Sequence, residues 1–132
     1  MADTVDSLPI FSGTKRRVTR FTNISDGTGE SAVVKVDIST LIGPDGVNAP
    51  TYTAIDEIEW SIQGFTSVRL SWDHTTDDEI AVLSGVGSVS WKDFGGAIDP
   101  KSSGGTGDIV LTTAGAVSGA TYDISISFRL KQ

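Results

Sequence analysis

The most regular pattern in the chain is an alternation of apolar and polar residues close to its C-terminal end. From residue 122 to residue 130, Tyr, Ile, Ile, Phe and Leu occupy the even positions and polar residues the odd ones. Successive side chains of a strand point to opposite faces, so this period of two predicts a strand with one buried and one exposed face. The same alternation recurs in residues 57–62 and 68–72, which places Trp60 and Trp72 in the expected core.

Weaker strands are predicted where β-branched residues gather between turn sequences. Glycine-containing turns such as SDGTG at 25–29 and GPDG at 43–46 separate these segments, because glycine adopts positive φ at no steric cost. No window sustains the apolar spacing of an amphipathic helix. We therefore expect an all-β fold, an antiparallel β-sandwich with a jelly roll as one of its arrangements. The weaker strands are expected at residues 17–24, 31–40, 78–83, 88–93 and 108–113.

The N-terminal residues differ from the rest in showing no sustained period. Residues 1–14, MADTVDSLPIFSGT, mix polar and turn residues with a short apolar patch and predict an extended N-terminal arm. Residues 15–132 are expected to form a single β-sandwich domain, a length typical of one domain. Residues 94–107, with paired glycines near both ends, are the longest expected loop.

Composition and charge narrow the classes of function. The formal net charge is -7, from 17 acidic and 10 basic residues, which argues against general binding to nucleic acid or to anionic membranes. The chain has no cysteine, which leaves neither disulfides nor thiolate metal sites. Its first residues carry acids where a secretory signal carries bases, and no apolar run approaches the roughly 20 residues of a membrane span. We expect a protein made in the cytoplasm, with no membrane and no nucleic-acid partner.

Catalytic and metal-binding patterns are not found in the sequence. His74, the only histidine, lies in an acidic run at 73–79, but the spacing fits neither an EF-hand loop nor a histidine-based zinc signature. No serine-nucleophile motif accompanies it. Glu57 and Glu59 alternate with apolar residues, so we interpret them as the solvent face of a strand and not as a glycosidase pair. We expect no catalytic residue, no metal site and no cofactor.

Two classes of function remain compatible with these residues. Trp91 is not clearly in phase with a buried face, and together with the 94–107 loop it could form an aromatic groove of a carbohydrate- or receptor-binding module. A small hydrolase is the other class, and it would require His74 to be buried beside a serine or an aspartate.

Several segments form an ordered set that resembles a known class of protein. The set covers most of residues 15–132, and together its members resemble small proteins encoded among the virion genes of tailed bacteriophages. The segments are RVTRFTN at 17–23, VVKVD at 33–37, IEWSI at 58–62, VRLSWD at 68–73, KDFGG at 92–96, GTGDIVLTT at 105–113 and YDI at 122–124.

The resemblance implies a structural role on a particle. It implies a capsid decoration, or cement, protein that binds the outside of the major capsid lattice and stabilises it. The implied partner is the major capsid protein, and the implied location is the capsid surface of the virion. The chain is also expected to be a homo-oligomer, with a trimer favoured.

The N-terminal segment supplies the candidate partner contacts. Its apolar side chains would gain by docking into a neighbour, and its basic side chains would complement an acidic neighbouring surface. An extended segment can also add a strand to an open sheet edge. The candidate partner-binding residues are Leu8, Ile10, Phe11, Lys15, Arg16 and Arg17.

Overall fold

The computed structural model describes residues 4–13, 15–31, 33–50, 52–73, 78–98 and 108–131, with the backbone alone at 4–6, 11, 12 and 78. These residues form a six-stranded sheet and a four-stranded sheet, here called sheet A and sheet B. Sheet A contains β1 (Thr4–Ser12), β2 (Arg16–Asp26), β4 (Tyr52–Gln63), β7 (Val86–Ser90), β8 (Ala97–Ile98) and β10 (Ser118–Lys131). Sheet B contains β3 (Val33–Val36), β5 (Ser67–Trp72), β6 (Asp78–Leu83) and β9 (Ile109–Ala114). Two short 3-10 helices are η1 (Ile38–Thr40) and η2 (Lys92–Phe94).

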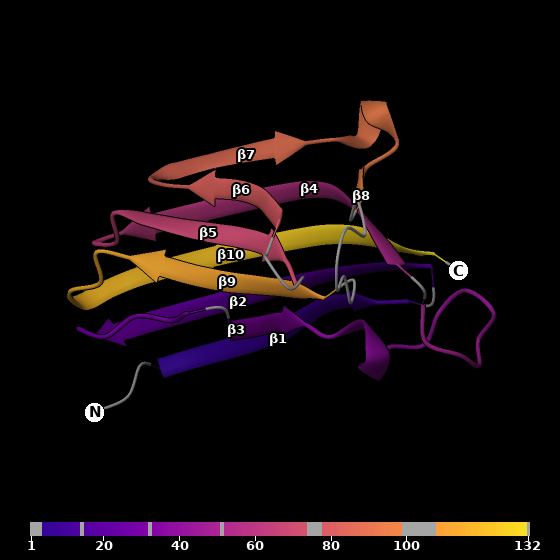
Figure 1. Cartoon of the computed structure of the whole chain (residues 1–132), viewed down its shortest axis with the longest axis horizontal. Coiled ribbons are helices and arrows are strands. Elements are labelled where there is room, and N and C mark those ends of the chain that lie inside the picture. The colour runs from indigo at the N-terminus through magenta and orange to yellow at the C-terminus, as the bar shows by residue number, and fades with distance from the viewer. Residues whose placement is uncertain are drawn as a thin grey trace.

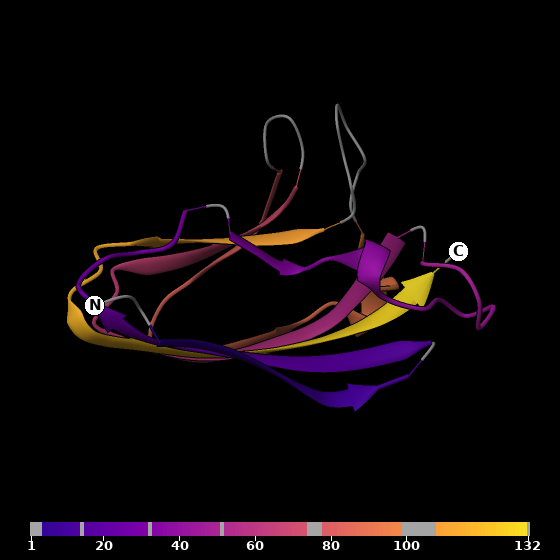
Figure 2. The same ribbon diagram turned by 90° about the horizontal axis from the view of Figure 1, so that it is seen from below.

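The order of the strands is that of a jelly roll. Sheet A runs β1-β2-β10-β4-β7, with β8 beside β4, and sheet B runs β3-β9-β5-β6. Except at β1–β2, β5–β6 and β7–β8, each strand is followed by one in the other sheet, so the chain winds around both layers. Figures 1 and 2 show these layers from the front and edge-on. The expected all-β antiparallel sandwich, and the jelly-roll arrangement within it, are confirmed.

The N-terminal segment is extended, as expected, but it lies in the sheet and does not reach away from it. Residues 4–12 pair along β2, from Thr4 opposite Ile24 to Ser12 opposite Arg17. This pairing satisfies backbone groups that would otherwise form the open edge of β2. Pro9 is tolerated within β1 because an edge strand can spare a backbone donor.

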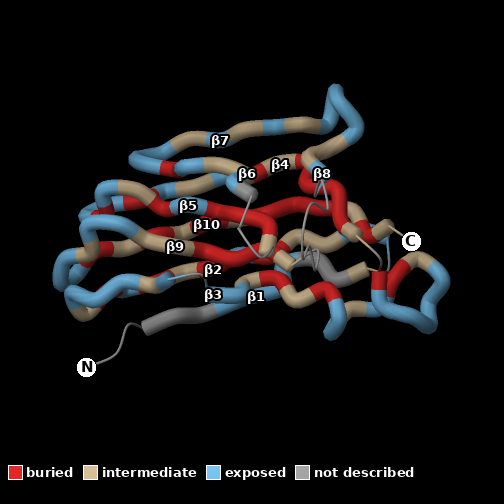
Figure 3. Tube along the Cα trace, in the orientation of Figure 1, coloured by how far each residue is buried: buried red, intermediate tan, exposed pale blue. Residues whose placement is uncertain are grey.

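The core lies between the two sheets and is centred on β10. All the even-numbered residues from 120 to 130 are buried, as the alternation predicted from residue 122 onward, and buried and partly buried residues alternate along much of β10 in Figure 3. Trp72 is buried among them, whereas Trp60 is half-buried and packs against the border of the core. The structure therefore confirms the core position of Trp72 and moves Trp60 to its edge.

Two predicted strands are shorter than expected and several are longer, β4 most of all. Val33–Val36 ends before Asp37, whose side chain caps η1 by accepting from the Ser39 backbone N–H. The strand expected at 88–93 ends at Ser90 and gives way to η2. β4 begins at Tyr52, well before the predicted start at 57, because Asp56 is an extra residue between two paired segments and interrupts the alternation.

A buried ion pair between Lys35 and Glu30 is connected to sheet A by hydrogen bonds. Lys35 Nζ lies 2.7 Å from Glu30 Oε2, and their side chains are only 6% and 8% exposed. The other carboxylate oxygen of Glu30 accepts from Tyr122 Oη at 2.5 Å and from Asn23 Nδ2 at 2.9 Å. The carboxylate is thus held by three donors, which is what a charge in a dry environment requires.

No helix in the described ranges is both long and apolar enough to cross a membrane.

Candidate functional site

The outer face of sheet A carries a regular grid of polar side chains. Residues opposite each other on an antiparallel ladder point to the same face, so the register places one side chain from each of five strands in a single row. The row faces away from the core, because Ser125 lies between the buried Ile124 and Ile126 on β10. This central row consists of Leu8 on β1, Arg20 on β2, Ser125 on β10, Glu59 on β4 and Ser88 on β7.

A trough follows β10 across this face. Two shallow hollows of about 550 Å³ and about 250 Å³ share Glu59 and Ser125 in their lining. The floor is low because β10 presents serines there, while its neighbours carry long side chains. The walls have opposite charge, with Glu57 and Glu59 on β4 and Arg16 and Arg20 on β2. We call this feature the sheet A trough.

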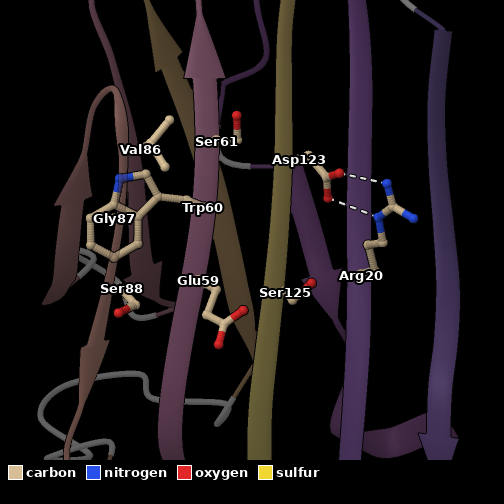
Figure 4. Close-up of a pocket in the computed structure, with 9 residues that line it drawn as sticks. All are labelled: Arg20, Glu59, Trp60, Ser61, Val86, Gly87, Ser88, Asp123 and Ser125. Carbon is tan, nitrogen blue, oxygen red and sulfur yellow. Dashed lines mark hydrogen bonds and ion pairs between the residues drawn. The ribbon is translucent and has the colours of Figure 1, made fainter.

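One ion pair is preformed inside the trough. Arg20 donates from Nε to Asp123 Oδ1 at 2.8 Å and from Nη2 to Asp123 Oδ2 at 2.5 Å, as the dashed lines in Figure 4 show. The hydrogen bonds to Asp123, and then its charge, raise the pKa of Arg20. A guanidinium has five N–H donors, so Arg20 keeps donors for a further partner in a fixed orientation.

Trp60 is also among the residues that line the larger hollow, but its register opposite the buried Ile124 places its indole on the core side of sheet A, over β7. Its indole lies against Gly87, where an added Cβ would come within 2.8 Å of the ring, and Nε1 donates to the Ser84 carbonyl at 2.9 Å. Figure 4 shows the ring projecting from β4 over the edge strand. Gly87 is therefore required for close packing, and the indole is fixed in place instead of forming a free platform.

The apolar members of the predicted contact set lie on this same face. Leu8 and Ile10 are each more than half exposed, and Ile10 lines the smaller hollow beside Val18. Phe11 pairs with Val18 through its backbone, but its side chain is outside the described residues. The structure thus brings Leu8 and Ile10 together at the rim of the sheet A trough.

The basic members of the predicted set are separated. Arg16 is exposed in the trough wall and donates from Nη2 to Ser127 Oγ at 3.1 Å. Arg17 is half-buried and lies in register with Phe128 on the core side. Lys15 is exposed at the β1–β2 turn. Only Arg16 of the three contributes to the trough, and Arg20, which lies four residues further along β2, contributes to it as well.

A second rigid feature, missed by the sequence reading, is the turn that carries η2. Asp56 accepts from Arg129 Nε at 3.0 Å through its carboxylate and from the Trp91 backbone N–H at 2.8 Å through its carbonyl. Arg129 Nη2 also donates to the Gly95 carbonyl at 2.7 Å. The turn is therefore tied to β4 and β10, and Phe94 at its tip is 82% exposed.

Glycines 95 and 96 in this turn offer a matched stability test. Both have positive φ, but an added Cβ meets open space at Gly95, whereas at Gly96 it would lie 2.9 Å from Ala54 Cβ and 3.3 Å from the Ile55 carbonyl oxygen. We expect Gly95→Ala to lower the free energy of unfolding by about 1 kcal/mol and Gly96→Ala by about 2–4 kcal/mol. Chemical denaturation measures both. Equal losses would contradict the tight approach of this turn to β4.

Within the ranges described, no three His, Cys, Asp or Glu residues gather closely enough to hold a metal ion. His74 and Asp77 lie outside those ranges, so the expectations for the acidic run stay predictions. Trp91 is half-buried against the core, which does not fit an exposed aromatic groove, and most of the 94–107 loop is also outside the described residues.

Comparisons with known proteins do not place the chain in a family. No protein-family model matches it, and no curated protein matches it. A solved structure with a similar course is a cupin superfamily protein from Desulfitobacterium hafniense, 11% identical, with a TM-score of 0.42, covering 100% of this chain and 82% of that one. A similarity this weak carries no argument about function.

Proposed function

We propose that the chain is a structural component of a bacteriophage virion, a capsid decoration or cement protein that binds the outside of the major capsid lattice and stabilises it. The resemblance of its ordered segments to phage virion proteins supports this assignment. Such a protein needs a rigid domain and an exposed contact surface, and it needs no catalytic centre. The proposal includes homo-oligomerisation and a non-catalytic role.

The observation that carries the proposal is the exposure of apolar side chains on a paired edge strand. Leu8 and Ile10 expose more than half of their surface on β1, beside the basic Arg16. Side chains fixed on a strand lose little conformational freedom on docking, and apolar surface gains about 25 cal/mol per Å² when it leaves water. The β1–β2 edge of sheet A is therefore suited to contact another protein.

A carbohydrate- or receptor-binding role is the second candidate. It is favoured by the hydroxyls of Ser61, Ser88 and Ser125 and the carboxylate of Glu59 in the larger hollow. Such groups can bind a hydroxylated ligand through hydrogen bonds. An array of glycans screened against the purified protein would distinguish this role, because a decoration protein needs no glycan for capsid binding.

Binding to capsids of the encoding phage tests the first candidate. Deleting residues 1–14 would remove β1 and expose the edge of β2, so point substitutions are sharper. We expect Leu8→Ser with Ile10→Ser to weaken binding to undecorated capsids more than tenfold, while the matched pair Val34→Ser with Val82→Ser, exposed on sheet B, leaves it unchanged. If the unmodified chain binds no capsid and leaves capsid heat stability unchanged, the proposed function is wrong.

A further inference from the structure

The two walls of the sheet A trough carry opposite charges that are not paired with each other. Strands β2 and β4 are separated by β10, so their backbones lie two strand spacings, about 10 Å, apart. In the described part of the chain, Glu59 has no ion-pair or hydrogen-bond partner, and Arg16 is bonded only to the Ser127 hydroxyl. Arg20 is already paired with Asp123 but keeps unused N–H donors, and Glu57 lies 3.7 Å from Lys92 Nζ. Among the four charged residues of the walls, Glu59 and Arg16 are thus the ones that lack an ionic partner in the described part of the chain.

The arrangement of these charges is self-complementary. Arg20 and Glu59 lie in the same row at equal distances on either side of Ser125. A two-fold axis that runs along β10 in front of this row would exchange the two walls between facing molecules. Arg20 of one copy would then lie over Glu59 of the other, twice in the pair, as an isologous interface requires. A two-fold axis across the strands would instead place each acidic wall over its own copy.

We propose that the occupant of the sheet A trough is a second copy of this chain, so that two molecules pair face to face about a two-fold axis along β10. Each copy contributes Arg20 and Arg16 to the acidic wall of its neighbour and Glu59 and Glu57 to the basic wall. The proposal goes beyond capsid binding, because it requires pairing of the protein in isolation. Both contacts use Leu8, so the pair would have to separate for the β1–β2 edge to bind the capsid. It assigns a two-fold contact where the resemblance favoured a trimer.

The shape and the apolar rim of the face support the same pairing. Short side chains along β10 allow two sheets to approach to the usual packing distance of about 10 Å. The axis that aligns the walls also brings β1 of one copy over β7 of the other. Leu8 would then lie over Ser88 and close to Val86, which is 82% exposed, so that exposed apolar side chains of both edges leave water together.

A charge exchange at the central row tests the pairing. Glu59→Arg places like charges opposite each other in its own homodimer, and so does Arg20→Glu. We expect each variant alone to associate more than tenfold more weakly than the unmodified chain, since like charges across an interface oppose association. In an equimolar mixture of the two variants, both rows become complementary, and a heterodimer should form. Sedimentation equilibrium and native mass spectrometry measure the association, and it should weaken as salt is raised.

A control variant and a second test variant separate this effect on association from unfolding and from a general effect of charge. Glu79→Arg breaks the exposed Arg69–Glu79 pair on sheet B and should leave association unchanged. Ser125→Trp fills the floor of the trough without changing charge and should also prevent pairing. Circular dichroism melts check that each variant remains folded.

The outcomes decide the proposal clearly. It is overturned if the unmodified chain is monomeric at the highest concentration reached, if Glu59→Arg pairs as well as the unmodified chain, or if the mixed variants fail to associate. In each case the trough is left to a glycan or to the capsid protein. Capsid binding is a separate result, because a monomeric Glu59→Arg chain that still decorates capsids would leave the proposed function standing.

Discussion

Replacing Lys35 with methionine is expected to lower the free energy of unfolding by about 3–5 kcal/mol. The substitution keeps most of the side-chain volume but removes the charge that faces the Glu30 carboxylate at 2.7 Å in a dry environment. Glu30 would keep its bonds from Tyr122 and Asn23, yet its charge would be uncompensated. Guanidinium denaturation, followed by tryptophan fluorescence, measures the loss.

The matched control is Arg69→Met, which breaks a pair of similar length on the surface. Arg69 Nε and Glu79 Oε1 are 2.9 Å apart, but their side chains are 58% and 52% exposed. Water solvates the remaining charge, so we expect a change below about 1 kcal/mol. If Lys35→Met cost no more than Arg69→Met, the Glu30 carboxylate would have to be hydrated in solution, and the buried ion pair would not be a source of stability.

Truncating Ile124 to alanine is expected to cost about 2–5 kcal/mol, through lost burial and the cavity left behind. Ile124 is 0% exposed and lies in the central strand of sheet A, opposite Phe21 on one side and Trp60 on the other. Neighbours held on both sides by sheet hydrogen bonds cannot collapse freely into the space. The cost should therefore lie in the upper part of this range.

The adjacent residue on β10 is the control for this truncation. Ser125→Ala removes a hydroxyl from the outer face, where the side chain borders the trough, so its effect on stability should be within about 0.5 kcal/mol. A large difference between neighbouring residues is the direct signature of a strand with one buried face. Similar losses at both positions would contradict the assignment of the outer face.

The parts of the fold that followed from local patterns were predicted well, and those set by distant contacts were not. The alternation of β10 was sufficient because a strand with a single dry face needs no other information. The first half of β4 was missed because Asp56 is an extra residue that Arg129 stabilises from β10. Lys35 and Glu30 were missed as interior residues, since a charge is expected at the surface unless its partner is known.

The candidate surface shows the same limit. Local pattern placed Glu57 and Glu59 on a solvent face, and Leu8, Ile10 and Arg16 among candidate contacts. That Arg20, Ser125 and Glu59 share one row depends on the register of β10 with both of its neighbours. Register and strand order are decided by pairing between distant segments: Ser125 lies opposite Glu59, 66 positions away, and Arg20 is bonded to Asp123 across 103 positions. A local pattern of apolar and polar residues contains no information on which distant segments pair, or in which register.

The central place of β10 in sheet A also has a consequence for how the chain folds during synthesis. β2 and β4 are each paired with β10 along most of their length, so these two strands have no partner between them until residues 118–131 have left the ribosome. Until then, Phe21 on β2 and Ile58 on β4 lack the strand that lies between them in the finished sheet. Pairings of such large sequence separation form slowly, and strands with open edges are prone to aggregate. We therefore expect the nascent chain to depend on chaperones until β10 has inserted.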